Sequence, residues 1–224
     1  MLGIIALVTV IWFSMTACGG NEDDGSGGLP DSTLTITDAQ VYLWNNDFTT
    51  AQYVKYTGTV SNLKYVEVVN SNGKSDRKPL NELIDGNPSV TLINGKLSIT
   101  LGKQKASSLQ NFFSTIPPGV TVSTTGVKIF FISYFFNGSD PQDTIASVFH
   151  SLAADGVIGG VTYIYSNKDV NINGTLSSGF NTYAMNLKAG WNPVIQTQSI
   201  TTDSVNISYK TGTPPADAKW IVHQ

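Results

Sequence analysis

Hydrophobic and polar residues alternate along much of the chain after residue 32. Leu34 and Ile36 alternate with threonines, and Val41 and Leu43 alternate with polar or aromatic residues a few positions later. Because a period of two is typical of a half-buried strand, residues 32–44 predict two strands or one bent strand. The same pattern predicts further strands at 53–60, 65–69, 161–165, 183–187, 191–197, 204–209 and 219–222.

A β-hairpin is predicted for residues 89–101. Asn94 and Gly95 lie between two alternating arms, and this pair favours a type I′ turn, whose two central residues need positive φ. Such a turn pairs Ile93 with Lys96 and fixes the register of the two arms. One face of the hairpin is then apolar, made of Val90, Leu92, Leu97 and Ile99.

Helical spacing interrupts the β pattern at a few places. A short turn is predicted at residues 79–84, because proline is favoured in a first helical turn. Residues 144–152 fit either a helix or a strand. Residues 105–116 predict an amphipathic helix, since apolar side chains recur at the spacing i, i+3, i+4 and i+7, namely Leu109, Phe112, Phe113 and Ile116.

Residues 127–136 are apolar on both alternations, which is typical of a strand that is buried on both faces. We expect the helix at 105–116 to cover the face of this strand that points away from the main core. The alternative is an exposed aromatic patch that binds a partner.

The complete pattern predicts an all-β fold. Asn173 and Gly174 suggest a second, weaker hairpin, and residues 156–160 suggest a loop. The expected architecture is one antiparallel β-sandwich, immunoglobulin-like or similar, over residues 32–224, with one or two short helices. The alternative is a β-barrel with a helix covering its mouth.

Charged residues make up only 13% of the chain, about half the usual share of roughly 25%. The 13 Lys and Arg residues against 16 Asp and Glu give a net charge of -3, and they form no basic cluster. Nucleic-acid binding, which needs such a cluster, is therefore not expected.

The long apolar stretch at residues 2–17 is too short for a membrane-spanning helix, which needs about 20 residues. It fits the apolar region of an export signal. No Lys or Arg precedes it, although export signals carry a basic first region, so we expect the translation start to lie upstream of Met1. An uncleaved anchor helix is the alternative.

Cys18 follows this apolar stretch directly. It is the single cysteine of the chain, which excludes an intramolecular disulfide.

Thr16, Ala17 and Cys18 after an apolar run resemble the lipobox of bacterial lipoproteins. The resemblance implies a signal peptide at 1–17, a palmitate-bearing lipid on Cys18 and attachment to the outer membrane, with the domain periplasmic or exposed on the cell surface. Residues 18–31 would form a flexible tether rich in Gly and acidic residues. The acids at 22–24 resemble the surface-export signal of lipoproteins in the Bacteroidetes group, and simple solvation of the tether is the alternative.

Candidate chemistry is sparse. A metal site needs clustered ligands, and His150 and His223 are the two histidines of the chain. Asp140 and Asp143 could offer oxygen ligands, but the pattern of a calcium loop is missing and a solvated turn is favoured. We therefore expect no metal, no cofactor and no catalytic residue that the sequence identifies.

Five aromatic residues could form a platform on which a sugar or a peptide stacks: Tyr42, Trp44, Tyr163, Tyr165 and Trp191. Because aromatic side chains bury large areas, a core position for them is favoured. The expected function is a non-enzymatic, lipid-anchored binding or structural protein with a glycan or protein ligand. The alternative is a polysaccharide hydrolase with a carboxylate pair that the sequence does not identify.

Overall fold

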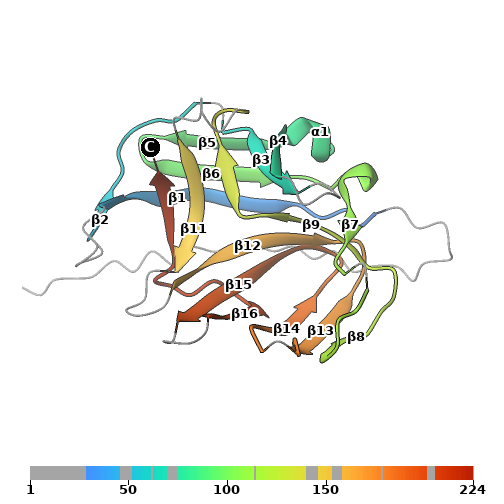
Figure 1. The fold of residues 1–224 in the computed structure, drawn as a ribbon. Helices are drawn as coiled ribbons and strands as arrows, with labels where there is room; N and C mark the ends of the chain where they lie inside the picture. The colour runs from blue at the N-terminus through green and yellow to red at the C-terminus, as the bar shows by residue number, and fades with distance from the viewer. Residues whose placement is uncertain are drawn as a thin grey trace, which may run out of the picture.

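The computed structural model describes residues 29–45, 52–61, 63–69, 75–113, 115–139, 146–152, 158–177, 179–200 and 205–223. The predicted signal segment, Cys18 and most of the predicted tether lie outside the described residues. The described part is built almost completely from β-strands, and its fold is all-β as predicted (Figure 1).

The strands of the first half are β1 (Leu34–Asn45), β2 (Gln52–Lys55), β3 (Tyr65–Val69), β4 (Ser75–Pro79), β5 (Ser89–Ile93), β6 (Lys96–Leu101), β7 (Gln110–Asn111) and β8 (Val120–Val122). Those of the second half are β9 (Lys128–Ile132), β10 (Tyr134–Phe136), β11 (Ser147–Leu152), β12 (Ile158–Ser166), β13 (Val170–Thr175), β14 (Asn181–Leu187), β15 (Gly190–Ile200), β16 (Val205–Thr211) and β17 (Lys219–His223). Helical structure is limited, within the described residues, to α1 (Leu80–Leu83) and a 3₁₀ turn at Ala106–Ser108.

Strand β1 is bent and takes part in two regions of sheet. Its first half pairs with β6, and its second half pairs with β2 and, in parallel, with β17. The register shifts between Ile36 and Ala39, where Asp38 has a φ of 51°. Of the two alternatives predicted for this stretch, two strands or one bent strand, the structure has the bent strand.

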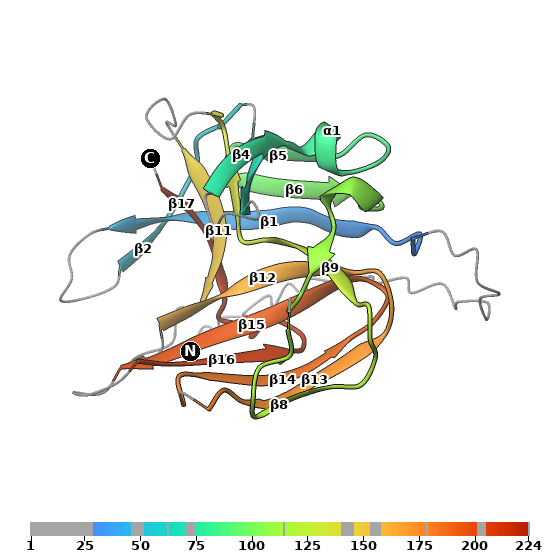
Figure 2. The ribbon, with the colours of Figure 1, turned by 45° about the vertical axis from the view of Figure 1, so that its right-hand side comes forward.

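The remaining strands form a continuous, curling sheet. From β1 the order runs through β17 and β11, and β11 then pairs with β10 on one stretch and with β12 on another. Beyond β12 the order is β15, β16, β14, β13 and β8. Figure 2 shows β13, β14 and β8 lying below β12, β15 and β16, so this part of the sheet curls back on itself. Among the pairings of these described strands, β1 with β17 and β14 with β16 are parallel, and the others are antiparallel.

Two hydrophobic cores lie on opposite faces of β12. Tyr163 and Tyr165 point into the first core, which β1, β5, β6 and α1 close from the other side. Ile164, between them in sequence, points into the second core, which the curl of β13, β14 and β15 encloses. The arrangement is a sandwich whose second half approaches a barrel.

The hairpin prediction is confirmed in register and in turn geometry. Strands β5 and β6 pair Ile93 with Lys96, and Asn94 and Gly95 have φ values of 50° and 72°. Leu92 and Leu97 are completely buried, as the predicted apolar face requires. The short helix α1 also follows Pro79 as predicted.

The predicted amphipathic helix at 105–116 is wrong. Only the 3₁₀ turn forms there, and β7 follows it and pairs with β9. The apolar residues at helical spacing point to different places: Leu109 packs on the first core, Phe112 and Phe113 pack on the second, and Ile116 is exposed. A single helix could not deliver these side chains to two cores, so the backbone follows the sheet instead.

The weaker hairpin at Asn173 and Gly174 is also wrong, because both residues lie inside β13 and pair with β14 and β8. A Cβ atom on Gly174 would lie 2.0 Å from the carbonyl oxygen of Gly119, so this glycine permits the close approach of β8. Residues 158–160, expected in a loop, begin β12 instead. The ambiguous segment 144–152 contains the strand β11.

The apolar stretch at 127–136 is divided at Ser133 into β9 and β10. Its side chains are buried on both faces, as predicted: Phe130 belongs to the first core and Ile129 to the second. Tyr134 is the exception, with 39% of its surface exposed.

Candidate functional site

A row of directly paired residues crosses the sheet from β17 to β14. The successive registers join six residues in the order Lys219, Ser151, Gly160, Gln196, Tyr209 and Tyr183. Directly opposite residues of neighbouring strands project from the same face of a sheet. These six residues, which we call the central row, therefore share one face although they come from distant parts of the sequence.

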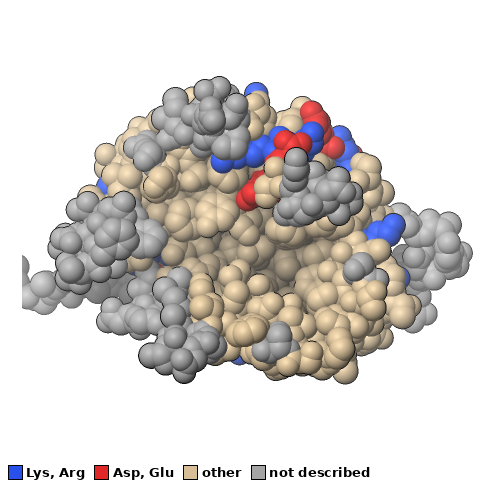
Figure 3. Space-filling view, in the orientation of Figure 1, with Lys and Arg blue, Asp and Glu red and all other residues tan. Residues whose placement is uncertain are grey.

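The central row lies on the concave face of the curled sheet. Side chains an even number of residues apart on a strand share a face. Ile164, Val194 and Met185 stand in this relation to Gly160, Gln196 and Tyr183 of the row, and all three belong to the second core. Figure 3 shows a hollow in the middle of the face drawn there, with mostly uncharged residues in the hollow and charged side chains gathered above it.

The middle of the row is small, polar and uncharged. Gly160 has no side chain, and Ser151 is nearly buried and donates a hydrogen bond to the Leu152 carbonyl. Ser133 and Thr162 lie beside them, with their hydroxyl oxygens 2.9 Å apart. The middle of the row therefore carries hydroxyl groups and no charge.

Tyrosine rings form the end of the row on β16 and β14. Tyr183 and Tyr209 stack with ring centroids 5.3 Å apart and an angle of 11° between the rings. Phe112 and Phe113 meet Tyr183 edge-on, at 6.1 and 5.7 Å. Burial raises the pKa of both tyrosines, so they remain neutral phenols at physiological pH. This end offers partly exposed, uncharged ring faces and hydroxyl groups.

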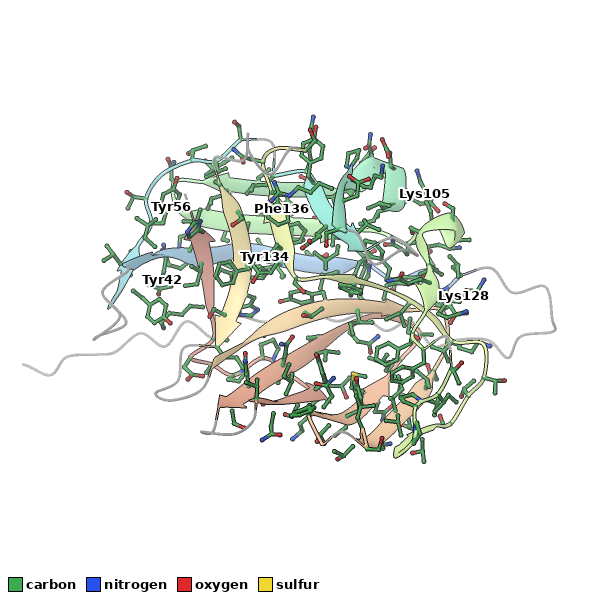
Figure 4. The ribbon with its side chains drawn as sticks, viewed as in Figure 1. Tyr42, Tyr56, Lys105, Lys128, Tyr134 and Phe136 are labelled. Atoms are coloured by element: carbon green, nitrogen blue, oxygen red, sulfur yellow. The ribbon has the colours of Figure 1, made fainter. Side chains whose placement is uncertain are left out.

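A second aromatic group lies on the same face, on β10 and β11. The Tyr134 ring is 5.0 Å from that of Phe149 and 5.9 Å from that of Phe136, measured between centroids. The Arg77 guanidinium lies 3.7 Å from the Phe136 ring centroid. Figure 4 shows Tyr134 and Phe136 one above the other near the middle of the face, with Tyr42 toward its left side.

A pocket of about 300 Å³ opens at β14, β15 and β16, close to the tyrosine end of the row. Gln198 and Ile207 are paired and lie two residues from Gln196 and Tyr209 on the same strands. They line the pocket together with Thr182, Thr197, Ser199, Asn206 and Ser208. These five residues are an odd number of positions from the row members of their strands, so the pocket opens mainly on the opposite face and does not extend the row.

The five-residue aromatic platform is not formed. Tyr163, Tyr165 and Trp191 are at most 7% exposed and point into the first core, on the face opposite to the central row. Trp191 donates from its indole nitrogen to the Gly102 carbonyl at 2.8 Å. The core interpretation is correct for these three residues.

Tyr42 is the member of the proposed platform that the structure places on the candidate face. It pairs with Ile221 of β17, next to Lys219. The side chain of Trp44 lies outside the part that the structure describes. The platform therefore has to be replaced by the central row and the aromatic groups beside it.

The other candidates for chemistry are scattered. The described residues contain no group of three or more His, Cys, Asp or Glu that could hold a metal ion. His150 is buried in an aromatic stack, Glu67 and Glu82 are exposed on separate elements, and Asp140 and Asp143 lie outside the described residues. No helix in the described ranges is long and apolar enough to cross a membrane.

Comparison of the chain with protein-family models, with curated proteins and with solved structures gave no match. The candidate site therefore stands on its own geometry. Sequence reasoning missed it because the six residues of the row come from six strands and meet only through the registers. The local signal that comes closest is the alternation within β15 and within β16. It shows which residues of each strand share a face with Gln196 or with Tyr209, and the register then joins the two.

Proposed function

We propose that this chain is a bacterial envelope lipoprotein, anchored through a lipid on Cys18, whose β-domain binds a glycan along the central row without cleaving it. The lipobox-like residues 16–18 support the anchor. One observation supports the binding role above all others: the registers align a lysine, a serine, an amide and two stacked tyrosines on one concave face.

The chemistry of this face suits a sugar chain. The C–H faces of sugar rings stack on aromatic rings, whose partly exposed surfaces Tyr183 and Tyr209 supply. Sugar hydroxyls both donate and accept hydrogen bonds, as do the Gln196 amide and the hydroxyls of Ser133 and Thr162. Gly160, in the middle of the row, adds no side chain between the lysine end and the tyrosine end.

The second candidate function is hydrolysis of a polysaccharide by two carboxylates placed about 5 to 10 Å apart. The central row itself carries no carboxylate, which favours binding over hydrolysis at this face. A glycan array with the lipid-free domain, followed by a hydrolysis assay on every glycan bound, tests both functions. Binding without turnover supports the proposal, and release of shorter products would favour the hydrolase.

Changing Tyr209 to alanine is expected to weaken binding of an array hit by about tenfold or more, as the loss of a central aromatic contact does at many interfaces. Tyr209→Phe keeps the ring and should retain most of the affinity. Phe180→Ala is the matched control, because Phe180 is half exposed but lies outside the row. Isothermal titration of the three variants checks this, and an unchanged affinity for Tyr209→Ala would place the site elsewhere.

Changing Cys18 to serine is expected to release the protein from membranes and to abolish labelling by radioactive palmitate. Stable anchoring requires more than one acyl chain. Without the Cys18 thiol the lipid cannot be attached, so the protein should lose its anchor. Fractionation and labelling of cells that express either form measure the effect. If the serine variant stayed in the membrane and neither form took up label, an uncleaved anchor helix would be the better explanation.

A further inference from the structure

Lys219 places a positive charge at one end of the central row. Its ammonium nitrogen lies 5.2 Å from the Tyr42 ring centroid and 5.8 Å from that of Tyr53. The ion pairs found among the described residues join Lys78 to Asp76 and Lys188 to Asp169, and neither involves Lys219. The rings orient the ammonium group but do not neutralise its charge.

The registers connect this charge to the tyrosine end of the row. Lys219 on β17 and Tyr183 on β14 are separated by five steps between neighbouring strands. At about 4.8 Å a step the row is about 24 Å long when measured along the sheet. An oligosaccharide of several rings can therefore contact the lysine at one end and the stacked tyrosines at the other.

The residues of the central row between these two ends carry no second charge. Ser151, Gly160 and Gln196 are all neutral, so the favourable electrostatic contact is confined to the lysine end. A lysine ammonium is a compact point charge with three donors, and it suits one negatively charged group better than a cluster of them. A sugar ring with a single carboxylate has the matching charge.

We propose that the central row binds an acidic glycan, with the carboxylate of a uronic acid residue on Lys219 and a further sugar ring on Tyr183 and Tyr209. This inference rests on the proposed glycan-binding function and makes it specific. It predicts that binding depends on charge at one end of the ligand and on stacking at the other.

The test compares uronate oligosaccharides of several linkages with the same compounds after reduction of their carboxyl groups to alcohols, and with sulfated oligosaccharides. The full β-domain is titrated with each, at low and at high salt. We expect a uronate oligosaccharide to bind about tenfold or more tightly than its reduced counterpart, as for a charge-assisted hydrogen bond. High salt should remove most of that preference.

Three variants assign the effect to Lys219. Lys219→Gln should abolish the preference for the uronate, and Lys219→Arg should keep most of it. Lys210→Gln removes the same charge from the opposite face, next to Tyr209 in sequence, and should change nothing. Three results would overturn this inference while leaving glycan binding intact. These are equal binding of the uronate and reduced forms, tighter binding of the sulfated forms, and a preference for the uronate that survives Lys219→Gln. If no glycan of any kind bound, the proposed function itself would fail.

Discussion

Gly95→Ala is expected to lower the free energy of unfolding by about 3 to 4 kcal/mol. This loss is the sum of two contributions, the cost of a left-handed backbone conformation for alanine and the cost of a steric clash of its Cβ atom. Gly95 has a φ of 72°, and a Cβ atom there would lie 1.8 Å from the carbonyl oxygen of Tyr56. That oxygen cannot move freely, because the turn is bonded on both sides. Gly95 donates to the Gly58 carbonyl at 2.8 Å, and its own carbonyl accepts from the Val41 amide at 3.0 Å. Relief of the clash would therefore disturb these contacts as well.

Gly86→Ala is the matched control for this change. Gly86 has a φ of 80°, but no atom lies within 4 Å of the position of its Cβ. It should lose only the conformational part, roughly 1 to 2 kcal/mol. Urea unfolding of both variants, with the slope checked for constancy, separates the two contributions. Equal losses in the two variants would show that the packing of the turn against residues 56–58 adds nothing.

Local chemistry was sufficient to predict the features that a few neighbouring residues determine. The hairpin at Asn94 and Gly95 follows from turn geometry and alternation, and the short helix α1 follows from Pro79. The bent strand β1 could be predicted because its apolar residues change from even to odd positions, and Asp38 absorbs this shift with a positive φ. In each case the determining residues are within about ten positions of one another.

Features that depend on two cores were not predictable from one local pattern. The spacing of Leu109, Phe112 and Phe113 matches a helix, yet these side chains divide between the cores and the backbone stays extended. A core position was the favoured interpretation for the aromatic residues of β12, and Tyr163 and Tyr165 lie in the first core, but the sequence did not show that β12 has a core on each face. Alternation along β12 separates its two faces, but it does not show which core each face contacts, because both faces are partly apolar.

The candidate site belongs to the same class of feature. Alternation within a strand identifies which residues share its face, but only the register between strands identifies which residues share a row. Gln196 and Tyr209 become neighbours because β15 pairs with β16, and Gly160 joins them because β12 lies on the other edge of β15. A functional row of this kind is set by long-range pairing, so a single sequence leaves it undetermined.

Acidification is expected to destabilise the domain through His150 by about 3 kcal/mol between pH 7 and pH 4, in addition to effects common to all carboxylates. The His150 ring stacks on Trp220 with centroids 4.5 Å apart, and Trp220 stacks on Tyr163 at 6.0 Å. The Nδ1 atom of His150 lies 3.1 Å from the Tyr163 hydroxyl. Burial lowers the pKa of His150 from 6.5 to about 4, against the opposing effect of a hydrogen bond with the Ala218 backbone.

The direction of this effect follows from the proton balance. Above pH 6.5 the histidine is neutral in both the folded and the unfolded chain, so it adds no pH dependence. Between pH 6.5 and about 4 the unfolded chain takes up a proton that the folded chain does not, and stability falls as the pH falls. Below about pH 4 both forms are protonated and the loss is complete.

Comparison with His150→Gln isolates this contribution, because glutamine can still accept a hydrogen bond but does not titrate in this range. The variant should be less stable than the original at pH 7.5, since the stacking on Trp220 is lost, yet its stability should fall less steeply toward pH 4. The exposed carboxylates Asp76 and Asp169, whose pKa values are lowered by contacts with lysines, titrate equally in both proteins and cancel. His223→Gln, at an exposed site, should leave the steep fall unchanged. Urea unfolding at several pH values measures all three proteins, and parallel curves for the original and His150→Gln would mean that the buried stack accepts a proton without cost.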